Sequence, residues 1–254
     1  MKLENENLLS SVKNTLRILR SFSMEQPQRG VRELAEELGI SKSSVQRILV
    51  TLASEGFVKK NNETNKYELG VSVLQLSSIV LGHLDLHNEA LPIIKNLVEK
   101  CKETSHLAVL EDLQIIYLCK VEGINPEKMI TYSGLHNPSH CTSSGKLLLA
   151  FGDPSQVELV ISKGLKPYTP NTITDPNKFR QELTKIYERG FSIGNEELRQ
   201  GVISISAPIR NYAGQVVAAI NFVGPSHRFS TQRIHFLAIE LIRAGEIISE
   251  RLGY

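Results

Sequence analysis

Residues 31–52 carry the pattern that most limits how this chain can fold, because they predict two short amphipathic helices separated by a tight turn. The first helix ends at Gly39, a residue type that readily adopts the left-handed conformation found at helix C-termini. Ser41 can cap the second helix, whose apolar residues recur at intervals of three or four: Val45, Ile48, Leu49 and Leu52. A further amphipathic helix over Val12 to Ser23 would complete a three-helix core.

The opposite side of the second helix is polar and basic. Its candidate DNA-binding residues are Lys42, Ser43, Ser44, Gln46, Arg47 and Thr51. Gln and Arg suit this role because each can make paired hydrogen bonds with one base edge, Gln with adenine and Arg with guanine. The pattern therefore predicts a helix–turn–helix whose second helix enters the major groove of DNA.

Two short strand patterns follow, Phe57 to Lys60 and Lys66 to Leu69, and they predict a β-hairpin wing. The wing would place three cations beside the DNA phosphates: Lys59, Lys60 and Lys66. The alternative is a helical hairpin capped by a β-ribbon that binds another protein. Glu55 is the only acidic residue between Lys42 and Lys60, and this favours DNA.

Composition sets limits but does not identify a partner. A chain of 254 residues with 41% hydrophobic and 22% charged residues is long enough for two domains. Its net charge of +2 is too small to indicate nucleic acid, so that inference rests on the local basic cluster. Three cysteines without a C-x-x-C pair fit a reducing compartment, and no segment resembles a signal peptide or a membrane span. We expect a cytoplasmic protein with no membrane partner.

A strongly apolar helical pattern begins after Gly70 and runs to about His87. Because so wide an apolar face has to be covered, we expect this helix to join two domains and to pack against its copy in a homodimer or a dimer of dimers. Such pairing would present two recognition helices to half-sites ~34 Å apart, or a multiple of that. The predicted domains are a DNA-binding domain (1–70), a dimerising linker helix (71–87) and a sensor domain (88–254).

The second half mixes helices and strands. The predicted helices are Asn88 to Glu103 with Pro92 in its first turn, Ser144 to Phe151, Asp153 to Ser162, Asp175 to Gly190 and a last one from Ser230. The predicted strands are His106 to Leu110 and Leu113 to Cys119 around a turn at Glu111-Asp112, Lys128 to Tyr132, Ile203 to Arg210, and Gln215 to Val223. Strands on both sides of the central helices predict an antiparallel sheet covered by helices, an α+β fold.

With these elements placed, the chain resembles the IclR-type transcriptional regulators over essentially its whole length. The resemblance lies in the winged helix ending at Tyr67 to Gly70, the linking helix, the segment His140 to Ala150 and the signature region Gly190 to Asn211. The chain departs from the family pattern at Asn221 and Val223, which stand at Ser positions of a family strand, and at two positions of the signature region. Gly194 lacks the side-chain oxygen that the family usually has there, and Arg210 replaces an aromatic residue or His.

The resemblance implies a GAF-like, dimeric or tetrameric effector-binding domain that senses a small metabolite, often a carboxylate, in a repressor-like regulator without cofactor or enzymatic activity. The effector-binding residues carried over are Ser143, Ser144, Gly194, Asn195, Ser204 and Asn221. For Ser143 and Ser144, physical chemistry supports the same role, because these residues stand at a predicted helix N-terminus and free backbone amides there bind anions such as a carboxylate. The alternative is that Ser143 only caps a helix and Ser204 only packs.

Two other functions are open for the second half. Cys141 adjoins His140, and a Cys–His pair can be nucleophilic, which allows a Cys-dependent hydrolase, although no third orienting group is evident. His136, His140 and Cys141, with Cys119 as a further candidate, are ligand types that zinc accepts, which allows a metal or redox sensor.

Overall fold

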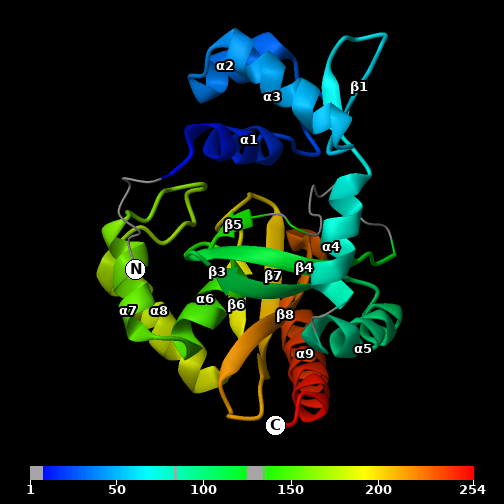
Figure 1. Ribbon diagram of the computed structural model, residues 1–254. Helices are drawn as coiled ribbons and strands as arrows, with labels where there is room; N and C mark the ends of the chain where they lie inside the picture. Colours follow the sequence, from blue (N-terminus) through cyan, green and yellow to red (C-terminus); the bar gives the residue numbers. More distant parts are fainter. Residues whose placement is uncertain (1–7, 83–84, 125–133, 135) are drawn as a thin grey trace. The chain divides into compact units, whose positions relative to one another are not determined.

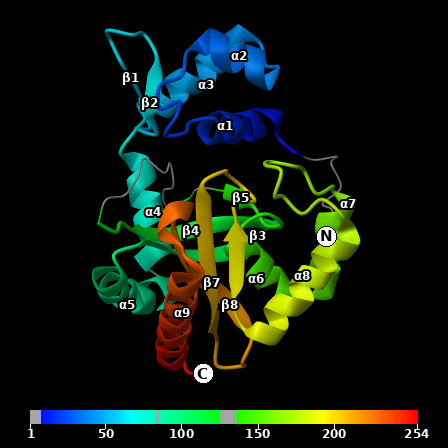
Figure 2. The same ribbon diagram turned by 180° about the vertical axis from the view of Figure 1, so that it is seen from behind.

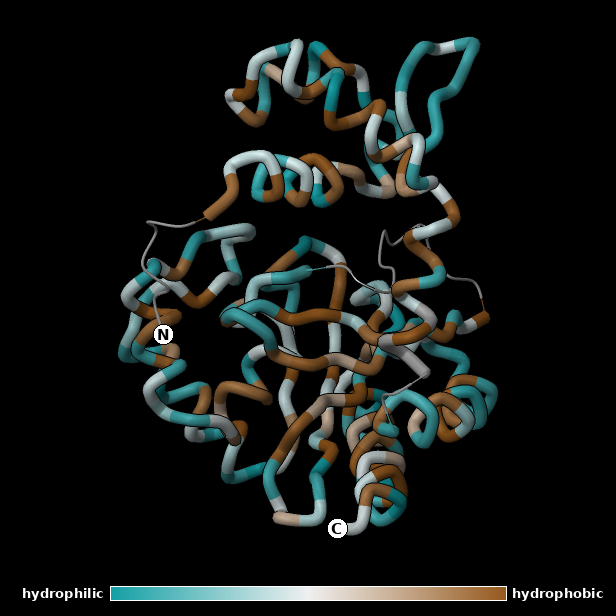
Figure 3. Tube along the Cα trace, in the orientation of Figure 1, coloured by the Kyte–Doolittle hydropathy of each residue, from teal (hydrophilic) through white to brown (hydrophobic). Residues whose placement is uncertain are grey.

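The computed structural model describes residues 8–82, 85–124, 134 and 136–254 (Figure 1). The chain folds into two compact units, of which the first ends at Val80 and the second begins at Leu81. Each unit has its own hydrophobic core, and Figure 3 shows apolar residues where the helices and strands of a unit pack together. Among the described residues, no helix is both long enough and apolar enough to cross a membrane.

The first unit is a winged helix–turn–helix. Its elements are α1 (Ser10–Arg20), α2 (Val31–Leu38), α3 (Lys42–Ser54), β1 (Val58–Lys60) and β2 (Tyr67–Leu69). Gly39 ends α2 with φ 64°, and the Oγ of Ser41 caps α3 by accepting the amide of Ser44 at 3.2 Å. The core contains Ile18, Leu34, Val45, Leu49 and Leu52. The predicted inward stripe of α3 and the predicted wing are confirmed.

The second unit is built on a six-stranded antiparallel sheet with strand order β5-β4-β3-β8-β7-β6 (Figures 1 and 2). Its strands are β3 (Thr104–Glu111), β4 (Gln114–Val121), β5 (His136–Pro138), β6 (Ser192–Asn195), β7 (Val202–Arg210) and β8 (Val216–Pro225). Helices pack on both faces, so the predicted α+β fold with an antiparallel sheet is confirmed.

Alternation along the strands assigns side chains to two layers, because successive residues of a strand point to opposite faces. Leu107, Ile205 and Phe222 pack with α5 (Asp85–Cys101) and α9 (Thr231–Arg251). On the other face, apolar residues pack with α6 (Ser143–Phe151), α7 (Pro154–Ser162) and α8 (Pro176–Arg189). The N-caps of α7 and α8 are Asp153 and Asp175, each followed by proline, as predicted.

The linker region differs from the prediction. Helix α4 covers Ser72–Gly82 and α5 covers Asp85–Cys101, so the described part of the second helix starts ahead of the expected Asn88, and the chain between the two helices lies outside the described residues. Pro92 lies inside α5 instead of in its first turn. Because Ala90, Ile94 and Leu97 of α5 are all buried, packing of this face offsets the backbone hydrogen bond that proline cannot donate.

Three strand details also differ. The β3–β4 turn is at Asp112-Leu113, since Glu111 pairs with Gln114 and both turn residues have positive φ, 49° and 66°. Such a turn matches the twist of the strands that it joins. Strands β5 and β6, of three and four residues, were not predicted because they are too short to show alternation. The strand predicted at Lys128 to Tyr132 lies outside the described residues.

The first-unit core supports a stability prediction. We expect Leu49→Ala, at a fully buried side chain, to lower the free energy of unfolding by about 2–5 kcal/mol, because it leaves a cavity between the helices. The neighbouring Val50→Ala is a matched control, since Val50 is 53% exposed, and it should change stability by less than about 0.5 kcal/mol. Urea unfolding combined with hydrogen exchange of α1–α3 measures both effects. Equal losses would contradict the assigned faces of α3.

Candidate functional site

The polar face of α3 is exposed in the first unit. All six sequence-selected residues of this helix are exposed: Lys42, Ser43, Ser44, Gln46, Arg47 and Thr51. The Nε2 of Gln46 donates to the hydroxyl of Tyr67 on β2 at 3.4 Å, so the wing contacts the middle of the helix. The guanidinium of Arg47 has no ion-pair partner among the described residues. These side chains are available to a partner in solution.

The three wing lysines are not equivalent. Lys59 and Lys60 on β1 are exposed, and neither takes part in an ion pair within the part of the chain that the structure describes. The Nζ of Lys66 instead lies 2.7 Å from Glu33 Oε1, and this hydrogen bond lowers the pKa of Glu33. Lys66 therefore has to exchange a partner before it can contact a phosphate.

A row of polar side chains crosses the sheet of the second unit, on the face that packs against α6. The row is formed by directly opposed residues of β6, β7, β8 and β3: Ser192, Ser206, Asn221 and His106. All four side chains are buried. Of these, only Asn221 was selected from the sequence, because the row exists only when the strands are in this register.

The N-terminus of α6 is hydrogen-bonded to this row. The Oγ of Ser206 donates to Ser143 Oγ at 2.7 Å and lies 3.0 Å from Ser144 Oγ, while Asn221 Nδ2 donates to Ser144 Oγ at 3.0 Å. The cap of the helix is Thr142, whose Oγ1 accepts the amide of Gly145. Among the described residues, the backbone amides of Ser143 and Ser144 have no acceptor. Ser143 is therefore not the cap, and two donors remain at this helix end.

Gly194 and Ser204 lie opposite each other on β6 and β7, in the row next to the one just described. A Cβ at position 194 would lie 3.1 Å from the amide nitrogen of Ser143 and 2.7 Å from Ser204 Oγ. Because Gly194 has no side chain, this position supplies no acceptor to the α6 N-terminus. Asn195, by contrast, is exposed at the sheet edge, so the structure separates it from the buried members of the predicted set.

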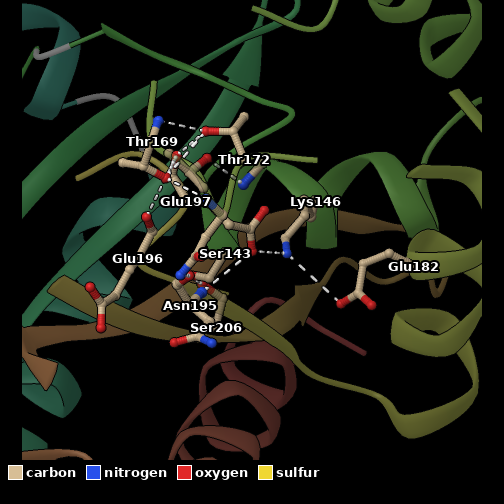
Figure 4. A network of polar contacts seen from close by, with 12 residues as sticks. Ser143, Lys146, Thr169, Thr172, Glu182, Asn195, Glu196, Glu197 and Ser206 are labelled. Carbon is tan, nitrogen blue, oxygen red and sulfur yellow. Dashed lines mark hydrogen bonds and ion pairs between the residues drawn. The ribbon is translucent and has the colours of Figure 1, made fainter. Parts of the chain in front are cut away.

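Lys146, one turn into α6, forms a buried ion pair that sequence reasoning did not identify. Its Nζ lies 2.5 Å from Glu197 Oε1 and 3.8 Å from Glu182 Oε1 of α8, as Figure 4 shows. Lys146 is 1% exposed and Glu197 6% exposed. Breaking such a pair costs about 3–5 kcal/mol, because one charge is left buried and unpaired. The pair connects α6 to the segment between β6 and β7.

Two threonines connect the loop before α8 to the same segment (Figure 4). The hydroxyl of Thr169 donates to the carbonyl of Glu196 at 2.7 Å, and that of Thr172 to the carbonyl of Glu197 at 2.6 Å. A cavity of about 650 Å³ opens beside the edge strand β6, and Lys146, Asn195 and Glu197 contribute to its lining. Figure 4 shows Lys146 between Glu197 and Glu182, with the two threonines beside the Glu196–Glu197 backbone.

The Cys–His pair lacks the features of a nucleophilic site. Cys141 is buried, and burial together with the negative charge of Glu197 raises its pKa to about 12, so it stays a thiol at neutral pH. The Nε2 of His140 lies 3.0 Å from the carbonyl oxygen of Lys166. This geometry offers no activated thiolate.

The proposed metal ligands are likewise not assembled as a set. The Nδ1 of His136 lies 3.2 Å from Gln114 Oε1, and Cys119 packs in the apolar layer beneath α5 and α9. Within the described ranges, no group of three or more His, Cys, Asp or Glu side chains is placed to hold a metal ion.

A winged helix–turn–helix unit followed by an α+β unit with a buried polar site defines a two-domain regulator architecture. Residues 11–62 match the IclR helix-turn-helix domain family, and residues 78–250 match the family described as bacterial transcriptional regulator IclR C-terminal. The chain belongs to the IclR family of bacterial transcriptional regulators.

Similar proteins agree with this assignment. The HTH-type transcriptional regulator KdgR of Escherichia coli (strain K12) is 32% identical over 248 residues, covering 97% of this chain and 94% of KdgR. The crystal structure of the Thermotoga maritima IclR has a TM-score of 0.77 at 30% identity, covering 96% of this chain and 99% of that one. An IclR homolog from Microbacterium hydrocarbonoxydans, complexed with 4-hydroxybenzoate, has a TM-score of 0.83 at 24% identity, covering 96% and 99%.

His106 predicts a pH dependence of stability. Burial lowers its pKa from 6.5 to about 4, so between these values the unfolded chain binds a proton that the folded chain does not. Stability should therefore fall by roughly 3 kcal/mol as the pH decreases through this window, in addition to changes from other groups. We expect His106→Asn to make the free energy of unfolding less dependent on pH there, as measured by urea unfolding. His235→Asn, at an exposed histidine, is the control and should keep the wild-type slope.

Proposed function

We propose that this regulator binds a double-stranded DNA operator through α3 and the wing, and that a small organic acid bound beside the N-terminus of α6 controls this binding. The observation that carries the proposal is the pair of backbone amides of Ser143 and Ser144, which have no acceptor among the described residues and are buried above the polar row of the sheet. A regulator of this kind operates in the cytoplasm, with the bacterial DNA.

Exposure and chemistry support the DNA contact. Gln46 and Arg47 are exposed next to each other on α3, and each can pair with one base edge in the major groove. One amide proton of Gln46 is directed to Tyr67, and the other is left for a base. Lys59 and Lys60 suit phosphates, which set orientation and affinity but carry no sequence information directly.

Exposed apolar side chains support a homodimer or a dimer of dimers. On α4, Leu76 and Ile79 are 53% and 54% exposed, and on α1, Val12 and Leu16 are 52% and 51% exposed. Apolar side chains gathered on exposed helix faces are typical of protein interaction surfaces. Pairing through them would bring two recognition helices to two half-sites.

The helix end supports an acidic effector. Backbone amides and the positive end of the helix dipole both favour a carboxylate at Ser143 and Ser144. Gly194 leaves the space beside the Ser143 amide free of a side chain, while Ser204 and Asn221 offer polar groups that can orient the remainder of a ligand. The homolog crystallised with 4-hydroxybenzoate shows that an IclR fold can hold an aromatic acid.

Control of DNA binding requires two arrangements of the protein with different affinities for the effector. The Lys146–Glu197 pair connects α6 to the β6–β7 segment, and the threonine contacts connect the loop before α8 to the same segment, so a ligand at the helix end acts on elements that are held together. We propose that these contacts transmit effector binding within the second unit.

The DNA contacts generate a first prediction. Arg47→Ala should weaken binding to a duplex selected from a random library and relax the preference at one base pair by ~1–3 kcal/mol. Lys59→Ala should weaken binding to all sequences alike and reduce the slope of log affinity against log salt by about one. Electrophoretic mobility shifts over a salt series distinguish the two. Equal loss of sequence preference in both variants would contradict the groove assignment.

The helix end generates a second prediction. Gly194→Asp should place a carboxylate beside the Ser143 amide and abolish stabilisation by added organic acids, because the internal anion competes for the same donors. Gly194→Ala adds the same Cβ, which has to displace the Ser204 hydroxyl in both variants, but it adds no charge and should retain part of the response. Thermal-shift titration with a panel of carboxylic acids that includes 4-hydroxybenzoate provides the measurement, since a ligand of the folded state raises its stability. An undiminished response in Gly194→Asp would remove the proposed anion site.

A further inference from the structure

The side-chain amide of Asn221 determines which nitrogen of His106 carries a proton. Asn221 Oδ1 lies 3.1 Å from the backbone nitrogen of His106 and 3.0 Å from its Nδ1. A backbone N–H can only donate, so the Asn221 atom that faces it is the oxygen, which can only accept. The Nδ1 of His106 must therefore be the protonated ring nitrogen.

It follows that Nε2 of the neutral imidazole is a hydrogen-bond acceptor. His106 is 0% exposed, and its Nε2 has no partner among the described residues. The ring stacks on Tyr117 with centroids 4.3 Å apart, which holds the imidazole in place. A buried acceptor without a donor is unfavourable and rare in folded proteins, so this nitrogen, unpaired within the described ranges, is a place where a bound molecule can donate a hydrogen bond.

The position of this acceptor connects it to the proposed effector site. Asn221 donates to Ser144 Oγ at the N-terminus of α6 and accepts from His106, so one side chain contacts both the helix end and the imidazole. An acid held at the α6 amides would therefore lie near His106. At Ser192, the far end of the same row, the buried Oγ also has no partner among the described residues.

We propose that the effector is a hydroxycarboxylic acid, whose carboxylate binds the α6 amides and whose hydroxyl donates a hydrogen bond to His106 Nε2. This inference rests on the proposed function, and it names the class of acid that the site selects. A site built to pair with a hydroxyl strongly rejects the analogue that lacks it, because the buried acceptor is then left unpaired.

The test compares matched acids on the full-length protein by isothermal titration: 4-hydroxybenzoate against benzoate, lactate against propionate, and gluconate against hexanoate. We expect at least one hydroxylated member to bind at least about tenfold more tightly than its partner. His106→Asn keeps a donor toward Asn221 but removes the Nε2 acceptor, so the preference should fall to about twofold or less, with binding of the non-hydroxylated member unchanged. His235→Asn is the control and should keep the preference.

The outcomes separate this inference from the proposed function. If acids bind but the hydroxyl makes no difference in the wild type, or if His106→Asn keeps the preference, the hydroxyl contact is wrong while the acid site stands. If no acid of either kind binds, the proposed effector class fails and the inference fails with it. A long-range proton–nitrogen NMR spectrum of the wild type is independent of any variant. An Nε2-protonated His106 would overturn the inference.

Discussion

The buried ion pair between Lys146 and Glu197 is the constraint on which the second unit's site depends. A lysine ammonium that is 1% exposed is tolerated only with an anion at contact distance, so α6 and the β6–β7 segment have to be in register with each other. That registration holds the N-terminus of α6 over the sheet. Ser143 and Ser144 then meet Ser206 and Asn221 rather than the apolar residues nearby.

The same site shows how polar groups can be buried in an apolar layer with little loss of folding free energy. Ser206 and Asn221, in the middle of the row, form hydrogen bonds with the serines of α6, so their burial does not leave these groups unsatisfied. Within the part of the chain that the structure describes, the unpaired groups of this row and of the helix end above it are Ser192 Oγ and His106 Nε2 at the two ends of the row, together with the amides of Ser143 and Ser144. In the proposed site, a ligand would complete this network by donating to His106 Nε2 and accepting from the two amides.

Much of the fold was predictable, because its signals are local. The three-residue and four-residue spacing of α3, the Ser41 cap and the Asp-Pro starts of α7 and α8 each depend on neighbours in the chain, and each is confirmed. The predictions that failed concern segments where tertiary packing outweighs the local sequence pattern. Pro92 is accommodated inside α5 although the sequence predicted it in the first turn of that helix. In β4, the register skips Leu118, and this places Cys119 in the same layer as Leu107.

The site was predictable only in part. Resemblance selected Ser143, Ser144, Ser204 and Asn221, but His106, Ser206, Lys146 and Glu197 became visible only in three dimensions. Glu197 and Ser206 stand in the signature region, and nothing in their spacing indicates which partners they meet. Asn195 was grouped with the buried residues, yet it lies exposed on the other side of the strand from Gly194, because adjacent residues of a strand point to opposite faces.

By itself, the sequence determined the helix–turn–helix, its exposed Gln46 and Arg47, and the α+β class of the second half, since apolar periodicity and capping are properties of short segments. Only the tertiary structure decided which buried polar side chains face one another across β6, β7, β8 and β3. That outcome depends on strand register, in which a shift of one residue moves every side chain to the opposite face of the sheet.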